Sequence, residues 1–162
     1  MNTTTLETLY TAFAKLDHAT MRTCYANDAV FEDEVFSLKG QDEIGAMWQM
    51  LCEATLKKKE NTDVWSFEFK GISTDGEVGK AHWEAHYRFS TGRMVHNIVD
   101  GTFIFNSAGL IIKHHDVFNF YGWSKQALGM TGYLLGWTEF LQNKVRSQAA
   151  EGLRKILIKR LE

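Results

Sequence analysis

Apolar residues recur at spacings of three and four in four segments of the chain, which is the pattern of helices with one buried face. Threonines at positions 3–5 and the later Asp17 are N-cap candidates for the first two helices, because their side-chain oxygens can accept a backbone N–H. The second helix is expected to end at Asn27 and Asp28. The four predicted helices span residues 3–15, 17–28, 41–57 and 138–161.

Five other segments are rich in β-branched and aromatic residues, and several of them alternate apolar with polar positions. Ser90–Arg93 and Asn106–Gly109 are predicted hairpin turns between three long strands. After the last strand, Ser124–Gly129 fits a single helical turn, and three nearby glycines leave residues 130–135 unassigned. The predicted strands span residues 29–36, 62–71, 80–89, 94–105 and 110–121.

Three helices followed by a strand-rich half predict an α+β fold, in which a curved antiparallel sheet forms a cone and the helices cover its concave side. A chain of 162 residues with 44% hydrophobic residues is long enough for one substantial core. We therefore expect a single domain over residues 1–162, with its core at about residues 5–122 and a C-terminal helical extension at about residues 123–162. The mouth of such a cone is a usual place for a ligand pocket.

The buried face of segment 80–90 depends on the turn that follows it. A two-residue turn would place His82 and Glu84 on the inner face, whereas a three-residue loop with a bulge would place Trp83 and Tyr87 there. The apolar alternation favours the second arrangement. His82 and Glu84 would then lie on the outer face of the sheet or at a dimer contact.

Charge and composition exclude several classes of function. The formal net charge is −2, so the chain has no basic surplus with which to neutralise phosphates, and we expect no nucleic-acid partner. No apolar run is long enough to span a membrane and the first residues do not form a signal peptide, so we expect a cytoplasmic protein with no membrane partner. Cys24 and Cys52 lack C-x-x-C spacing and are expected to be buried free thiols, although a disulfide is left open.

Asp116 is the leading candidate for acid–base chemistry. It lies in the last predicted strand on the same face as His114 and Phe118, so its carboxyl is expected to enter the pocket partly shielded from water. An equal alternative is a structural Asp116 bonded to a neighbour such as His114 or Asn97. We predict Asp116, Asp33 and His114 as the catalytic residues, with the two carboxyls held in different protonation states in one apolar cavity.

The aromatic residues predicted around the pocket suit an apolar or aromatic ligand. The chain has no phosphate loop, dinucleotide fingerprint or nucleophile elbow, and its histidines lack the spacing of a metal-binding helix. We therefore expect no cofactor and no metal. The residues predicted to contact the ligand are Asn97, Trp83, Tyr87, Phe31, Trp48, Phe103 and Phe118.

Short motifs follow one another in a recognisable order along the chain. They are Tyr-Ala-Asn-Asp-Ala-Val-Phe-Glu-Asp at 25–33, Trp-x-Ala-x-Tyr-x-Phe at 83–89, Thr-Gly-Arg at 91–93, Phe-x-Phe at 103–105 and Gly-x-Ile-x-x-x-His-Asp-x-Phe at 109–118. On these motifs the chain resembles the SnoaL-like branch of the nuclear-transport-factor-two-like superfamily, which is the fold of ketosteroid isomerase, limonene-epoxide hydrolase and some polyketide cyclases. The resemblance implies the cone fold and a small-molecule pocket. It also implies a homodimer, because the outer sheet face commonly pairs in this superfamily.

Some site residues carry over by position in this resemblance. Asp33 falls where the isomerase has its general base, and Asp116 falls where the hydrolase has the acid of its last strand. His82 and Glu84 fall at the hydrolase's Arg-x-Asp pair. The resemblance does not imply one reaction, because the fold hosts many.

Two functions are consistent with these observations. The first is binding of a small apolar or aromatic molecule with cofactor-independent acid–base catalysis of the isomerase, cyclase or hydrolase type. The alternative is a non-catalytic module for ligand binding or dimerisation. The sequence leaves open whether the protein is an enzyme.

Overall fold

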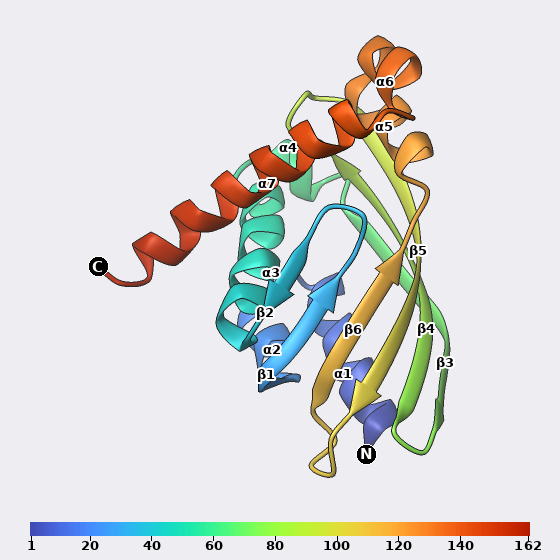
Figure 1. Cartoon of the computed structure of the whole chain (residues 1–162), viewed down its shortest axis with the longest axis vertical. Coiled ribbons are helices and arrows are strands. Elements are labelled where there is room, and N and C mark those ends of the chain that lie inside the picture. The colour runs from blue at the N-terminus through green and yellow to red at the C-terminus, as the bar shows by residue number, and fades with distance from the viewer.

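A computed structural model describes all 162 residues as an α+β fold built on one curved, six-stranded sheet. The strand order is β2-β1-β6-β5-β4-β3, and every neighbouring pair is antiparallel except β1 and β6, which are parallel. Figure 1 shows the helices on the concave side of the sheet and α7 crossing the molecule diagonally. The elements are α1 (Asn2–Ala14), α2 (His18–Thr23), β1 (Tyr25–Glu32), β2 (Ser37–Lys39), α3 (Gln41–Leu56), α4 (Lys59–Thr62), β3 (Ser66–Asp75), β4 (Val78–Arg88), β5 (Met94–Phe105), β6 (Ile111–Val117), α5 (Phe120–Leu128), α6 (Met130–Leu135) and α7 (Glu139–Lys159).

The first two helices differ in their ends from the sequence prediction. Helix α1 already begins at Asn2, so the threonines at positions 3–5 lie inside it and none caps it. Asp17 does cap α2, since its carboxylate accepts the backbone N–H of Thr20 at 3.1 Å. Helix α2 ends at Thr23 rather than at Asn27 and Asp28, because the chain enters strand β1 at Tyr25.

The β4–β5 hairpin has the three-residue loop that the apolar alternation favoured. The N–H of Phe89 donates to the carbonyl of Arg93 at 2.8 Å, and Gly92 occupies the left-handed region with φ of 84°. In this register Trp83 lies opposite Val99, and both side chains are buried. The sequence prediction of the inner face is confirmed, and the two-residue alternative is wrong.

The segment predicted as one strand over residues 29–36 contains the end of β1, up to Glu32, and then the turn that leads to β2. The carboxylate of Asp33 accepts the backbone N–H groups of Val35 and Phe36 at 2.7 and 2.6 Å, and the N–H of Asp33 donates to the carbonyl of Phe36 at 2.9 Å. These bonds close the turn, and the chain returns as β2 beside β1.

The last strand is also shorter than predicted. Asn119 caps a helix with its side chain, which accepts the N–H of Gly122 at 2.9 Å, so Phe120 begins α5 instead of ending a strand. Trp123 of α5 donates its ring N–H to the hydroxyl of Tyr87 at 2.9 Å, which ties α5 to the sheet.

Helix α6 packs closely on α5 through glycines. A Cβ at Gly132 would lie 1.9 Å from the carbonyl oxygen of Ser124, and one at Gly136 would lie 2.1 Å from the Ser124 hydroxyl. The glycines that left residues 130–135 unassigned therefore permit this close approach.

Helix α7 returns along the body and packs against α3. Its Leu141 and Leu153 are buried. No helix has the length and the apolar composition needed to cross a membrane.

Candidate functional site

A cavity of about 770 Å³ lies between the concave face of the sheet and the helices. Most of its lining is hydrophobic and comes from β1, α3, β4, β5, β6, α5 and α7. The polar side chains of Arg88, Lys144 and Gln148 also contribute to the lining. Cavities of this size and composition suit drug-sized apolar molecules.

Asp116 of β6 lies in the cavity wall and is only 2% exposed. Gly101 lies opposite it on β5, and a Cβ at that position would lie 2.8 Å from Asp116 Oδ1 and 3.1 Å from the ring of Phe103. The absence of a side chain at Gly101 therefore makes room for the carboxylate on this face of the sheet.

Asp116 ends a chain of buried hydrogen bonds that begins on α3. The ring N–H of Trp48 donates to the Tyr25 hydroxyl at 3.1 Å, Tyr25 lies 2.8 Å from His114 Nδ1, and His114 Nε2 lies 2.8 Å from Asp116 Oδ1. Because an indole can only donate, Tyr25 is free to give its own proton to a neutral His114, which then donates Nε2–H to the carboxylate. All donors then point toward Asp116, and we name Trp48, Tyr25, His114 and Asp116 the relay.

The relay makes His114 a positioning residue, since it does not line the cavity. Its side chain is fully buried between Phe31 and Phe103, with ring centroids 4.8 and 4.2 Å away. His114 fixes one oxygen of Asp116 and leaves the other without a protein partner.

Asp33 also lines the cavity, at the opposite end of β1 from Tyr25. Burial raises the pKa of its carboxyl to about 6, with a smaller increase from the charge of Asp116, although the N–H groups of Phe36 and Val35 oppose the shift. The charge of Asp116 therefore acts on Asp33, which also has the structural task of closing the β1–β2 turn.

The raised pKa of Asp33 predicts a pH-dependent effect of Asp33→Asn. Because the folded-state pKa of about 6 lies above the ordinary 3.8, ionisation costs wild-type stability as pH rises from about 4 to about 6. The amide keeps an oxygen for both N–H groups and has no charge. We expect the variant to be about 1–3 kcal/mol more stable than wild type at pH 8 and equal to it near pH 4.

Urea unfolding at the two pH values checks this prediction. A variant less stable than wild type at pH 8 would show that the ionised carboxylate is needed for the turn.

Six of the seven side chains predicted to contact a ligand line the cavity: Asn97, Trp83, Tyr87, Phe31, Trp48 and Phe118. The prediction for Phe103 is wrong, because its ring packs between Tyr10 and His114 and does not line the cavity. Tyr87 has a pKa raised to about 12 by burial, so its hydroxyl is protonated and accepts the Trp123 N–H.

Two buried donors near the site lack partners within the protein. The ring N–H of Trp83, in the cavity wall, has no acceptor, and neither does the hydroxyl of Tyr10. The pKa of Tyr10 is raised well above its usual value, first by burial and then by the charge of Asp116. Buried polar groups without a hydrogen-bond partner are uncommon in proteins, and a functional role is one of the explanations for them.

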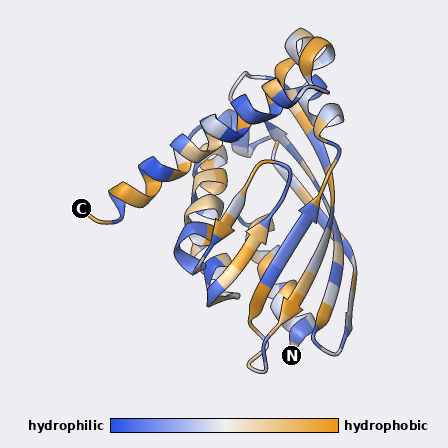
Figure 2. Cartoon of the chain, in the orientation of Figure 1, coloured by the Kyte–Doolittle hydropathy of each residue, from blue (hydrophilic) through white to orange (hydrophobic).

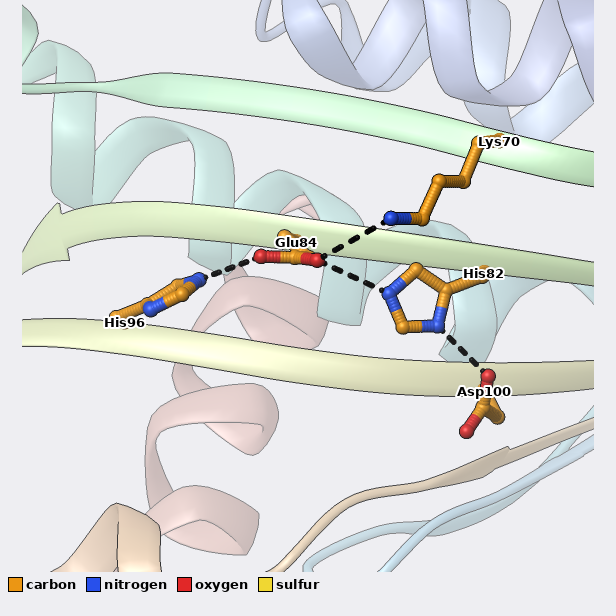
Figure 3. Close-up of polar contacts among 5 residues, drawn as sticks. All are labelled: Lys70, His82, Glu84, His96 and Asp100. Carbon is orange, nitrogen blue, oxygen red and sulfur yellow. Dashed lines mark hydrogen bonds and ion pairs between the residues drawn. The ribbon is translucent and has the colours of Figure 1, made fainter.

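The prediction that His82 and Glu84 lie on the outer face of the sheet is confirmed, so these residues do not enter the cavity. Both side chains lie on the outer face of the sheet, where His82 lies 2.8 Å from Asp100 and 3.1 Å from Glu84 (Figure 3). Glu84 also lies 2.7 Å from His96, and Lys70 is 3.8 Å away. No group of three or more His, Cys, Asp or Glu side chains is arranged to hold a metal ion.

The hydrogen bonds on the outer face shift the pKa values of His82 and Glu84. The hydrogen bond with Asp100, and then that with Glu84, raises the pKa of His82, while bonds from His82 and His96 lower the pKa of Glu84. These groups lie on the other side of the sheet from the cavity, because adjacent residues of a strand face opposite sides.

Helix α7 supplies cavity residues that the sequence prediction did not assign to the site. Leu141, Val145 and Ala149 line the cavity at successive turns of the helix. Their helical spacing was visible in the sequence, but nothing in it indicated which surface they would cover.

The sequence profile of the SnoaL-like domain matches residues 6–114, about two thirds of the chain. The chain belongs to the SnoaL-like domain family. The family assignment and the α+β fold confirm the resemblance seen in the motifs, while helix α7 lies outside the matched region. No curated protein matches the sequence.

Solved structures with this fold include several functional classes. An epoxide hydrolase of the limonene-epoxide-hydrolase-like type from Mycobacterium tuberculosis is 20% identical, with a TM-score of 0.59, and the match covers 83% of this chain and 95% of that one. A putative polyketide cyclase from a Silicibacter species is 15% identical, with a TM-score of 0.62 and coverage of 77% and 93%. A hypothetical protein from Catenulispora acidiphila with a ketosteroid-isomerase-like fold, solved with trimethylamine, is 12% identical, with a TM-score of 0.63 and coverage of 83% and 96%. Identities this low establish the fold alone.

Proposed function

We propose that the protein binds a small apolar or aromatic molecule in the cavity and catalyses a cofactor-independent proton transfer with Asp116 as the base. The observation that carries the proposal is the relay. It holds one oxygen of a buried carboxylate while that residue forms part of an apolar cavity wall. A carboxylate fixed in this way, away from bulk water, is suited to general-base catalysis.

The same geometry suggests the chemical class of the substrate. An apolar cavity with a carboxylate in its wall suits a small apolar molecule with an oxygen function such as a carbonyl, epoxide or hydroxyl. Proton abstraction beside a carbonyl and addition of water are the two candidate steps. They correspond to isomerase or cyclase chemistry and to hydrolase chemistry.

A thermal-shift screen of small carbonyl and epoxide compounds tests binding. Ala149→Trp narrows the cavity from the α7 side, whereas Ala150→Trp adds the same ring to an exposed position one residue away. A ligand at a hundred times its dissociation constant stabilises the folded state by about 2.7 kcal/mol. We expect that stabilisation in wild type and Ala150→Trp and its loss in Ala149→Trp.

A ligand that stabilises Ala149→Trp as strongly as wild type would place binding outside the cavity. A ligand that binds in the cavity without being converted would favour the second candidate, a non-catalytic binding module. The position of His82 and Glu84 on the outer face of the sheet supports that candidate. Neither residue can act with Asp116 in the cavity as the corresponding pair would in epoxide hydrolysis.

We also propose a homodimer through the outer face of the sheet, where Ile98, Ile104 and Val117 are exposed. Sedimentation as a monomer at micromolar concentration would contradict it.

We propose the cytoplasm as the compartment of the protein. Its reducing environment suits the free, buried Cys24 and Cys52, and cell fractionation is the test.

A further inference from the structure

Helix α6 exposes its large apolar side chains and buries its glycines, which is the reverse of an ordinary surface helix. Its glycines face the protein, with Gly132 and Gly136 against Ser124 of α5, while its large apolar side chains face water. Met130 is 72% exposed and Leu134 is 64% exposed. An amphipathic helix normally buries such residues, so this arrangement presents them to something outside the chain.

The exposed residues continue from α6 into the start of α7 and form one apolar surface. Figure 1 shows this segment at the upper right, and the ribbon of α6 in Figure 2 is partly in hydrophobic and partly in pale colours. Trp137 is 75% exposed and Phe140 is 69% exposed. We call this surface the apolar tip, and it consists of Met130, Tyr133, Leu134, Leu135, Trp137 and Phe140.

Two cations without acidic partners lie beside the apolar tip. Arg93, Lys125 and Tyr133 line a shallow pocket that contains no acidic residue. Neither Arg93 nor Lys125 forms an ion pair, and the ammonium of Lys125 lies 4.5 Å from the ring centroid of Tyr121 and 5.5 Å from that of Tyr133.

The whole region has a charge opposite to that of the chain. Residues 120–146 contain three basic residues and one acidic residue, whereas the chain has a formal net charge of −2. Lys125 lies beside the apolar tip together with Arg93, whereas Lys144 lines the cavity and Arg146 donates to the carbonyl of Glu34.

We propose that the apolar tip docks on an anionic lipid surface, with its aromatic side chains in the headgroup region and Arg93 and Lys125 on lipid phosphates. Tryptophan and tyrosine prefer that depth, and cations near an anionic leaflet add about 1 kcal/mol each. The earlier expectation of no membrane partner considered spanning segments, and a projecting tip needs none.

Charge favours a membrane over a second copy of the chain as the occupant. A two-fold contact through the apolar tip would bring two copies of Arg93 and Lys125 into one interface, with Glu139 as the only acidic residue of segment 120–146 to balance them. The phosphates of an anionic membrane provide the opposite charge.

The position of the tip gives docking a consequence for the cavity. Leu128 and Thr131, which flank the tip, and Leu141 of α7 line the cavity. Docking would bring the lipid surface near these lining residues. This proposal does not depend on the proposed catalysis, because docking requires no chemistry at Asp116.

Vesicle sedimentation tests the proposal with the full chain. The probes are vesicles of phosphatidylcholine alone and of phosphatidylcholine mixed in equal amounts with phosphatidylglycerol. We expect wild type to sediment with the mixed vesicles and to be released by salt. Trp137→Ser with Phe140→Ser should bind at least about tenfold more weakly. Ile158→Ser with Leu161→Ser removes two exposed apolar residues at the opposite, C-terminal end of α7 and should bind like wild type.

Charge and fluorescence give two independent readings. Lys125→Glu should weaken binding to the mixed vesicles by about tenfold. Trp137 is the most exposed of the five tryptophans, so vesicles should shift its emission to shorter wavelength in wild type and not in the Trp137 variant. If the double tip variant loses its fold by circular dichroism, Lys125→Glu and Leu134→Ser carry the test.

Wild type that stays in solution with both vesicle types overturns the proposal, as does a double tip variant that sediments as well as wild type. A lipid-free dimer that becomes monomeric in the double tip variant also overturns it, because the apolar tip would then be a contact between copies.

Discussion

Asp116→Asn is expected to lower the turnover of a cavity substrate by about 10²–10⁴-fold while its dissociation constant stays roughly unchanged. The amide has the shape of the carboxyl and keeps an oxygen for the N–H of His114, so the cavity wall is preserved. It cannot accept a proton from the substrate. Measuring kcat beside the dissociation constant separates loss of the base from loss of the site.

Glu84→Gln is the matched control for this substitution. It makes the same carboxyl-to-amide change on the opposite face of the sheet, where the side chain contacts His82 and His96. We expect its turnover to equal that of wild type. Full activity in Asp116→Asn would eliminate Asp116 as the base and leave Asp33 as the other carboxyl in the cavity lining.

His114→Phe is expected to destabilise the fold by about 2–4 kcal/mol. The phenyl ring can occupy the space between Phe31 and Phe103, but it cannot bond to Asp116 or to Tyr25. The substitution therefore leaves a buried carboxylate without its partner, which is the costly way to break such a pair. Denaturant unfolding measures the change.

Two comparisons make the test specific to the relay. His115→Phe changes the neighbouring, exposed residue and should alter the free energy of unfolding by about 0.5 kcal/mol or less. His114→Phe should also cost less in the Asp116→Asn background than in wild type, since the two side chains interact directly. Additive effects would mean that the 2.8 Å contact between them contributes nothing to stability.

The sheet was largely predictable from the sequence because alternation records which face is buried. Trp83, Ala85 and Tyr87 alternate with polar residues, and that pattern identified both the inner face of β4 and the loop that produces it. Asp116 and His114 were placed on the inner face by the same argument, and both are buried there.

The errors arose where a single polar side chain redirects the backbone. Asp33 closes a turn and Asn119 starts a helix, each inside a run with strand composition. The prediction that Tyr25 lies in a helix, and not in β1, had the largest consequence. It hid the contact between Tyr25 and His114, and with it the relay. Such contacts join residues far apart in the chain, so no local pattern reveals them.

The apolar stripe of α7 has a consequence for the shape of the cavity and for the ligand proposed to bind there. Leu141, Val145 and Ala149 form part of the cavity wall, yet they lie beyond residue 114, where the shared family region ends. The matched family region contains most strands around the cavity, whereas Asp116 and this part of α7 lie after it in the chain. Exchanging that helix between relatives would be a route to changing substrate range while leaving the reacting groups untouched.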